Sequence, residues 1–292
     1  KLTRALFSHW VPNWDISGKN LTANFNNNKT MKMVKQLKYT FTFLLIITAF
    51  ASNAGEDEEK KKYVEKSYKV NASTALKIEN KFGDVEINTW GKSEFSIKVE
   101  IIGKGRNAER AQKILDGIDI RIRESDSQIS FETESDDIKT KNEEGFEVNY
   151  TVYMPEKNPQ DIKNSFGDTS MWNRIGNLDL KVAYGSMKVG DIKGQTNVKL
   201  SFGNGSIGTV GNGEFNVKYS DFDIESGNNL DITQGFSNLE IDNVEDLEID
   251  SKYGSLDIKK AYKIDADVHF SGFEIEELTG SLELDCSYLG DF

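Results

Sequence analysis

Cysteine, histidine and proline are scarce in this chain of 292 residues, which contains one Cys, two His and three Pro. A lone cysteine excludes a disulfide framework and any zinc site built on cysteines. So few prolines exclude collagen and proline-rich linkers. These absences remove small disulfide-stabilised domains and cysteine-based zinc folds from consideration.

Basic residues are also outnumbered, with 36 Lys and Arg against 48 Asp and Glu and a formal net charge of −12 at pH 7. This balance disfavours sequence-independent binding to a phosphate backbone, so no nucleic-acid partner is expected. The charged fraction of 29% and the hydrophobic fraction of 37% are near those of globular proteins. They exclude a disordered polyampholyte and a protein with many membrane spans.

One apolar segment near the amino end has the form of a secretory signal. Basic residues between Lys32 and Lys38 precede an apolar stretch at 40–50, and Ala51 or Ala54 offers a cleavage site. About a dozen apolar residues are too few to span a bilayer comfortably, so cleavage is favoured over a retained anchor. We expect an exported protein of the periplasm, cell surface or medium, with no membrane span after cleavage. The amino-terminal segments are interpreted as an untranslated or non-native leader (1–30), a signal peptide (31–54) and a charged, solvated linker (55–65).

A six-residue phrase repeats along the rest of the chain: an aromatic residue, Gly or Ser, any residue, an apolar residue, any residue and an aliphatic residue. From Phe166 onward its copies are spaced by 17 or 18 residues. Each copy holds two short stretches of apolar–polar alternation, which is typical of strands that bury one face. Stacked copies can share a core that a single copy cannot form. The copies begin at Phe82, Phe166, Tyr184, Phe202, Tyr219, Phe236, Tyr253, Phe270 and, as a partial copy, Tyr288.

The repeat predicts an all-β protein, a single-chain β-solenoid (β-helix) with coils of 17–18 residues over 155–292. An antiparallel meander of hairpins is the alternative, but a near-constant period suits identical coils better. Alternation predicts that Glu240, Glu248 and Asp257 point outward. The side chains predicted to point inward are Leu239, Ile241, Leu247, Ile249, Leu256 and Ile258.

Residues 66–154 interrupt the repeat and are expected to form an amino-terminal β-rich unit. Several strand-like runs flank one short helix at 108–117, for which Asn107 is the expected cap. An open solenoid end exposes a sheet edge, and a terminal cap would cover it. We therefore expect this unit to pack on the first coils.

Stacking would align the aromatic residues of the copies in one ladder along the solenoid axis. Packing at the corners explains such a ladder, since offset aromatic stacking contributes about 1 kcal/mol per pair beyond burial. An exposed ladder could instead hold sugar rings or the surface of a partner. The Gly or Ser that follows each aromatic residue is interpreted as a corner device that permits unusual backbone angles.

Candidate chemistry is sparse. His269, the one histidine outside the first 54 residues, stands beside a repeat corner, and Cys286 follows Leu282 and Leu284 at period two and is predicted to point into the core. No nucleophilic triad or metal cluster can be assembled from them, so no catalytic residue, cofactor or enzyme activity is expected. The alternative is a carbohydrate-active enzyme, a polysaccharide lyase or glycoside hydrolase that uses carboxylates on a β-helix.

Charge divides the repeats into two regions, because residues 160–218 carry a net +2 and residues 219–292 a net −15. Stacking would align the acidic outward residues in columns, where like charges repel. They form either a solvated face or a site for divalent cations such as Ca²⁺, which prefers oxygen ligands. The cation-binding candidates are Asp223, Glu240, Asp257 and Glu274. A second column would contain Asp231, Glu248, Asp265 and Glu283.

The phrase Leu76-Lys-Ile-Glu-Asn-Lys-Phe-Gly-Asp84, repeated in similar form at Asp161–Asp168, carries a resemblance to a known family. Over about residues 66–292 the chain resembles the bacterial exported putative-adhesin β-strand-repeat family, a domain of unknown function. The resemblance implies a β-helix-like fold and an envelope location, and it transfers no catalytic or binding residues. We expect an exported, non-enzymatic scaffold of the bacterial cell envelope whose partner is an envelope glycan or protein.

Overall fold

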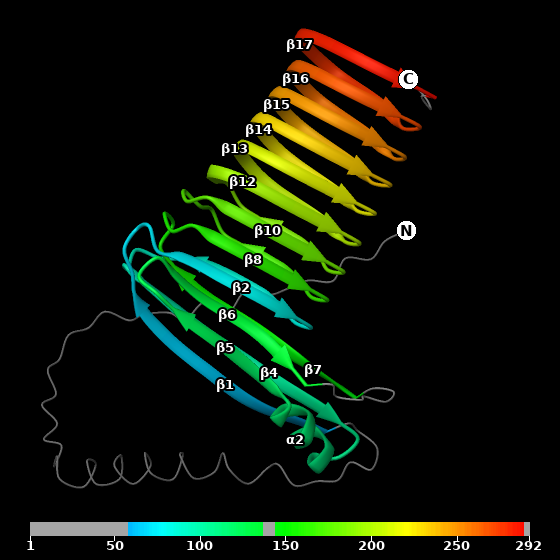
Figure 1. Cartoon of the computed structure of the whole chain (residues 1–292). Coiled ribbons are helices and arrows are strands. Elements are labelled where there is room, and N and C mark those ends of the chain that lie inside the picture. Colours follow the sequence, from blue (N-terminus) through cyan, green and yellow to red (C-terminus); the bar gives the residue numbers. More distant parts are fainter. Residues whose placement is uncertain (1–57, 137–143, 289–292) are drawn as a thin grey trace, which may run out of the picture. The chain divides into compact units, whose positions relative to one another are not determined.

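The computed structural model describes residues 58–136 and 144–288 (Figure 1). The expected leader and signal peptide, residues 1–30 and 31–54, lie outside the described residues. The elements are β1 (Glu58–Lys69), β2 (Ala75–Lys81), β3 (Val85–Thr89), β4 (Glu94–Gly105), α2 (Ala108–Asp116), β5 (Ile118–Glu124), β6 (Gln128–Ser135), β7 (Gly145–Met154), β8 (Gln160–Ser165), β9 (Thr169–Met171), β10 (Leu178–Ala183), β11 (Met187–Val189), β12 (Ile192–Ser201), β13 (Asn204–Lys218), β14 (Asp221–Gly235), β15 (Asn238–Lys252), β16 (Ser255–His269) and β17 (Gly272–Ser287).

Strands β8 to β17 form the predicted β-solenoid. Each pairs in parallel with the strand one coil further on, so that Leu178 lies beside Thr196 and Leu239 beside Leu256. Figure 1 shows these strands as a regular stack with all arrows in one direction. Parallel pairing excludes the antiparallel meander for these coils, since adjacent strands of a meander run in opposite directions. The all-β solenoid class is confirmed.

One continuous apolar core runs through the coils. Leu239 and Leu247 on β15 are 1% and 3% exposed, whereas Glu240 and Glu248 on the same strand and Asp257 on β16 are exposed. The predicted inward and outward positions are therefore confirmed. The period of two holds because each pleated strand faces the core on one side and solvent on the other.

The first coil, β2 and β3, lies between two sets of strands distant in sequence. On one side β2 pairs with β8 and β3 with β9, and on the other β2 pairs with β6 and β3 with β7. Strand β5 then adds antiparallel to β6, β4 to β7 and β1 to β4. The interruption thus continues the stack and closes it with antiparallel strands, as expected of a cap.

Helix α2 packs on β4 through Ala111, Ile114 and Leu115, all buried. Its start is fixed by Asn107, whose side chain accepts a hydrogen bond from the Arg110 backbone N–H at 2.9 Å, a standard N-cap. Close approach depends on glycine in β4, because a Cβ at Gly103 would lie 2.5 Å from the Ala111 carbonyl oxygen. The predicted helix and its cap are confirmed.

The charged segment predicted as a linker at 55–65 differs from the structure, since β1 begins at Glu58. Its side chains alternate between exposed and partly buried positions, and its lysines find partners on β4 and beyond. Lys61 lies 3.3 Å from Glu100, and Lys62 donates to the Ile118 carbonyl. Lysine-rich segments are compatible with an edge strand, where half of the side chains remain in water. The charge run therefore belongs to the fold.

Cys286 was predicted to be buried and is exposed. It lies on β17, which pairs with β16 alone among the described strands. Leu278 and Leu282 on the same strand are 38% and 40% exposed. The alternation was identified correctly, but β17 has a neighbouring coil on one side only, and in its second half the inward side chains of Leu282 and Cys286 stay exposed.

Candidate interaction surface

A ladder of nine stacked aromatic rings runs along one edge of the coils. The centroids of successive rings are 4.8–5.1 Å apart, and the planes of neighbouring rings differ by 1–14°. These residues occupy turns between consecutive strands, as Phe82 does between β2 and β3 and Phe166 between β8 and β9, and the turns form a regular row in Figure 1. The ladder consists of Phe82, Phe166, Tyr184, Phe202, Tyr219, Phe236, Tyr253, Phe270 and Tyr288.

Every ladder residue adopts a left-handed backbone conformation, with φ between 53° and 60°. This region is unusual for bulky side chains and costs roughly 1–2 kcal/mol per residue. Stacking contributes about 0.5–1.5 kcal/mol per ring pair, and an internal ring has two neighbours. The two terms are of similar size, so the stack offsets the strain that the turn imposes.

The turn is tight because the residue after each ring approaches the preceding coil. A Cβ at Gly185 would lie 2.1 Å from the Gly167 carbonyl oxygen, so these early coils require glycine. After Tyr219, Phe236 and Phe270 serine takes this place, and the hydroxyl of Ser220 donates to the Lys218 carbonyl at 2.8 Å. The predicted corner device is thus present in two chemical forms.

Two buried asparagines, Asn80 and Asn164, stand two positions before the ladder residues Phe82 and Phe166. Asn80 donates from Nδ2 to the carbonyl oxygens of Gly83 at 3.2 Å and Val148 at 2.9 Å. Asn164, one coil on, donates to the carbonyl of Gly167 at 3.1 Å. Buried carbonyl groups need such donors because leaving them unpaired costs about 1–3 kcal/mol each. The asparagines therefore serve the turns and leave no free group for a ligand.

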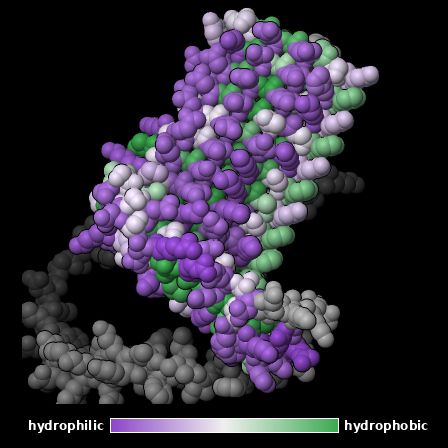
Figure 2. Space-filling model, in the orientation of Figure 1, coloured by the Kyte–Doolittle hydropathy of each residue, from purple (hydrophilic) through white to green (hydrophobic). Residues whose placement is uncertain are grey.

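The ladder rings are half exposed, from 40% at Phe82 to 53% at Phe236, and 77% at the terminal Tyr288. Figure 2 shows the ladder as a row of alternating green and pale side chains along one edge. Because each ring face is covered by the next ring, solvent meets the ring edges and, at every tyrosine, a phenolic hydroxyl. The ladder therefore combines both sequence-based interpretations: it stabilises the turns by stacking, and it is a surface.

The cation-binding candidates lie in one column as expected, with Asp223 beside Glu240, Glu240 beside Asp257 and Asp257 beside Glu274. The second acidic column is aligned in the same way. Lys259 Nζ lies 2.7 Å from Glu240 Oε1, so an amine already neutralises the centre of the first column. Within residues 58–136 and 144–288, no group of three His, Cys, Asp or Glu is placed to hold a metal ion.

Crowding of carboxylates alters one member of this column. Partial loss of hydration raises the pKa of Asp223 above its ordinary value, and the negative charges of Glu240, Asp221 and Asp242 raise it further. The nearby Lys259 acts in the opposite direction. Repulsion within the column is therefore felt by the folded protein.

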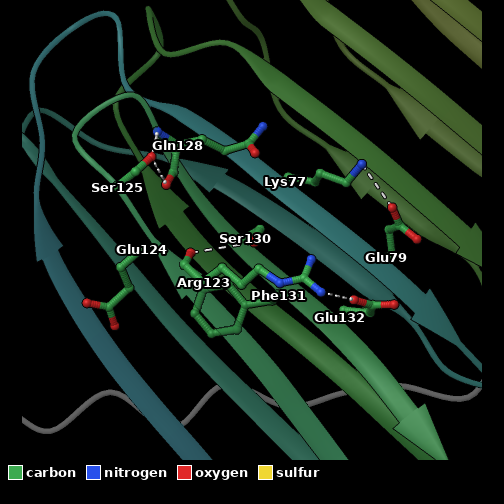
Figure 3. Close-up of a pocket in the computed structure, with 9 residues that line it drawn as sticks. All are labelled: Lys77, Glu79, Arg123, Glu124, Ser125, Gln128, Ser130, Phe131 and Glu132. Atoms are coloured by element: carbon green, nitrogen blue, oxygen red, sulfur yellow. Dashed lines mark hydrogen bonds and ion pairs between the residues drawn. The ribbon is translucent and has the colours of Figure 1, made fainter.

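A pocket of about 230 Å³ between β2, β5 and β6 contains both acids and bases, the combination expected of a carbohydrate-active enzyme (Figure 3). Its acids are already engaged. Lys77 contacts Glu79 at 2.9 Å, Tyr68 donates to Glu124 at 2.8 Å, and Arg123 lies 3.5 Å from Glu132.

The hydrogen bond from Lys77 lowers the pKa of Glu79, which keeps this carboxylate ionised. Glycoside hydrolysis needs a carboxylic acid that is still protonated near neutral pH. The lowered pKa of Glu79 therefore disfavours its action as the proton donor of a glycosidase. Of the other two acids of the pocket, Glu124 accepts a hydrogen bond from Tyr68 and Glu132 forms an ion pair with Arg123.

His269 lies at the predicted corner, beside the ladder. Its Nε2 is 2.7 Å from Asp267 Oδ1, and its Nδ1 contacts the hydroxyl of Ser287. Asp267 lies on the same strand as His269, β16, whereas the contact with Ser287 joins β16 to β17. Among the described residues, no helix is long and apolar enough to cross a membrane.

No family description matches the chain, and no curated protein matches it in sequence. Several solved structures align with this chain at low sequence identity. A putative adhesin from Bacteroides fragilis NCTC 9343 is 14% identical, with a TM-score of 0.42 over 74% of this chain and 94% of that one. A putative adhesin from Parabacteroides distasonis ATCC 8503 is 10% identical, with a TM-score of 0.48 over 78% and 95%. A putative lipid binding protein from the same organism is 9% identical, with a TM-score of 0.35 over 77% and 96%.

Proposed function

We propose that this protein is an exported, non-enzymatic scaffold of the bacterial cell envelope that binds its partner along the aromatic ladder. The observation that carries the proposal is the ladder itself: nine aromatic side chains, each at least 40% exposed, in one unbroken row. Exposed apolar side chains that form a continuous patch are typical of interaction sites in proteins. Export is supported by the basic, apolar and small-residue pattern at 31–54.

The orientation of the rings favours a protein partner over a glycan. Sugar rings bind aromatic side chains through the ring face, and here each internal face is covered by a neighbour at about 5 Å. Exposed edges and tyrosine hydroxyls suit a partner that contacts the ladder laterally, with apolar side chains and hydrogen-bond acceptors. Tyrosine is one of the residues enriched in the energetically important part of protein interfaces.

Binding to panels of purified envelope proteins and envelope polysaccharides tests the proposal. The double variant Tyr219→Ser and Phe236→Ser opens the centre of the ladder and should abolish binding. Glu248→Ala, on the sheet face, is the matched control and should bind normally. Equal binding by both variants, with circular dichroism showing that both are folded, contradicts a role of the ladder.

Two further measurements complete the test. Amino-terminal sequencing of protein isolated from its bacterium should show cleavage near Ala51 or Ala54. A chain that still begins at or before Met33 contradicts export. Reducing-end assays on the same polysaccharides should show no hydrolysis, whereas turnover that is lost in a Glu132→Gln variant would establish the enzyme alternative.

A further inference from the structure

The outward residues three positions before the eight ladder rings from Phe166 to Tyr288 form a column with an internal symmetry of charge. Glu79, three positions before Phe82, lies beside Lys163 at the end of this column. The strand register places these eight residues side by side, coil after coil. Three lysines come first, two neutral residues follow, and three aspartates end the column. In order they are Lys163, Lys181, Lys199, Asn216, Thr233, Asp250, Asp267 and Asp285.

Read in the opposite direction, the column has an aspartate at each position where the forward column has a lysine, and a lysine where the forward column has an aspartate. If a second copy is rotated by 180° about an axis across the ladder, midway between Tyr219 and Phe236, the column meets its own reverse. Each lysine then faces an aspartate of the other copy, and the two neutral residues face each other. The opposed pairs are Lys163 with Asp285, Lys181 with Asp267, Lys199 with Asp250 and Asn216 with Thr233.

The ladder follows the same reversal. From Phe166 to Tyr288 phenylalanine and tyrosine alternate strictly, so the rotation places every phenylalanine edge opposite a tyrosine edge. No two hydroxyls are then directly opposed, because each tyrosine faces a phenylalanine of the other copy. The rings from Phe166 to Tyr288 are parallel within 9° from one to the next, so the row is straight enough for such contact along its length.

The column directly before the rings is compatible with this arrangement in size and charge. Small residues face large ones, as with Ala183 opposite His269 and Gly235 opposite Lys218, and no like charges are opposed. A parallel arrangement of two copies would instead bring Lys181 near Lys188 and Asp250 near another aspartate, Asp257. Like charges opposed in this way are costly, which favours the antiparallel arrangement on the lysine and aspartate side of the ladder. On the other side the same rotation opposes Asp223 and Glu240, where Lys259 already lies 2.7 Å from Glu240.

We propose that two copies of this chain associate antiparallel along their aromatic ladders, with the lysines of one copy facing the aspartates of the other. The inference rests on the proposal that the ladder is a binding surface, and it names the occupant. The arrangement is a closed two-fold dimer in which each contact occurs twice.

The size of the surface is sufficient for a reversible dimer. Eight rungs at a strand spacing of about 4.8 Å give a strip roughly 35–40 Å long, and the columns beside them make it about 15–20 Å wide. About 700 Å² per copy is close to the ~800 Å² per partner of a standard interface. Within one copy Lys181 is paired with Asp179, Asp250 with Lys252 and Asp267 with His269, so the repulsion inside each like-charge column is already partly offset. The partner's opposite charges would offset the remainder.

Sedimentation equilibrium of residues 55–292, which form one compact unit, tests the inference over roughly 1–200 μM. The unaltered protein should dimerise reversibly and more weakly in 1 M NaCl, where charges are screened beyond about 3 Å. Two triple variants should each raise the dissociation constant by more than about tenfold, because they oppose like charges. The variants are Lys163→Glu with Lys181→Glu and Lys199→Glu, and Asp250→Lys with Asp267→Lys and Asp285→Lys.

An equimolar mixture of the two triple variants should restore the dimer, since every opposed pair then has opposite charges. Asp231→Lys with Glu248→Lys and Asp265→Lys changes the net charge equally in the acidic coils, away from the ladder, and should leave the dimer intact. A protein that is monomeric throughout, or a dimer that survives both triple variants, overturns the inference.

Disulfide trapping tests the orientation. In a Cys286→Ser background, protein with Ser165→Cys and protein with Ser287→Cys should form a covalent dimer when mixed and oxidised, and neither should do so alone. Failure of the mixture to cross-link contradicts the antiparallel register. If Tyr219→Ser with Phe236→Ser abolishes envelope binding while both triple charge variants remain dimeric, this inference fails and the proposed function stands. If the ladder variant alters neither dimerisation nor envelope binding, both fail.

Discussion

The coils of residues 160–218 and those of residues 219–288 have the same interior and opposite exteriors. Both bury aliphatic side chains at equivalent positions, as Leu180 and Leu247 show at 0% and 3% exposure, and both end each coil with an aromatic residue at positive φ. Outside, the first region carries a net +2 and residues 219–292 a net −15. The inward and turn positions thus define the coil, while the outward positions are free to carry charge of either sign.

The shared interior predicts the largest effect. Leu180→Ala in the basic coils and Leu247→Ala in the acidic coils should each lower the free energy of unfolding by about 2–5 kcal/mol, as other buried leucine truncations do. The outward neighbours Lys181→Ala and Glu248→Ala should change it by less than about 0.5 kcal/mol. Urea unfolding midpoints of the four variants measure this. Equal effects of Leu247→Ala and Glu248→Ala contradict the assignment of faces.

The turn that both regions share predicts a smaller loss of stability, in which glycine substitutions should cost less than alanine substitutions. Phe202→Ala and Phe236→Ala, one in each region, remove two ring contacts and should cost roughly 1–3 kcal/mol. Glycine at the same positions loses the same contacts but relieves a strain of about 1–2 kcal/mol at positive φ. Glycine variants should therefore be more stable than alanine variants in both regions. Thermal melts of the four proteins give the order, and alanine above glycine would contradict the strain.

The exteriors predict a difference in response to ions. The columns from Asp223 and Asp231 repel internally, so monovalent salt should stabilise the protein by screening at about 10 Å in 0.1 M salt. A Ca²⁺ site would add stability beyond this, because a ligand bound only by the folded state shifts unfolding. Thermal melts in chelator, NaCl and CaCl₂ at matched ionic strength separate the two. We expect equal midpoints in NaCl and CaCl₂, since Lys259 already occupies the first column; a higher midpoint in CaCl₂ would establish a cation site.

The smallest effect concerns pH and one carboxylate. The pKa of Asp223 is raised in the folded protein, so the folded state binds this proton more tightly than the unfolded chain does. Its contribution to stability therefore falls as pH rises from the ordinary value of 3.8 through the raised value. Asp223→Asn should be more stable than the unaltered protein above this range and equal to it below. Urea unfolding from about pH 3 to pH 8 measures the difference, and one that does not vary with pH contradicts the assignment.

Much of this fold can be predicted from the sequence because every coil repeats the same order of apolar, polar and aromatic positions. The alternation around Leu239 and Leu247, the cap helix after Asn107 and the alignment of Asp223 with Glu240 were predicted, and the structure has all three. These features depend on residues within one coil or one coil apart, which periodicity reveals directly.

Features that depend on the ends of the stack were not predictable in this way. The charge run that begins near Glu58 was interpreted as a solvated segment, because the sequence does not show that β4 pairs with it. Cys286 follows the buried alternation but lies on a strand with one neighbour. The symmetry of the column from Lys163 to Asp285 is written in the sequence, yet it becomes visible only when the strand register fixes which residues share a column.

Inverting the whole column in one chain tests most directly the claim that the interior defines the coil and the exterior selects the partner. The chain would carry Lys163→Glu, Lys181→Glu, Lys199→Glu, Asp250→Lys, Asp267→Lys and Asp285→Lys, and its mass is measured by sedimentation equilibrium beside its urea midpoint. Because every opposed pair again has opposite charges, this chain should fold as the unaltered protein does and dimerise with a similar dissociation constant. A folded chain that stays monomeric would contradict the account.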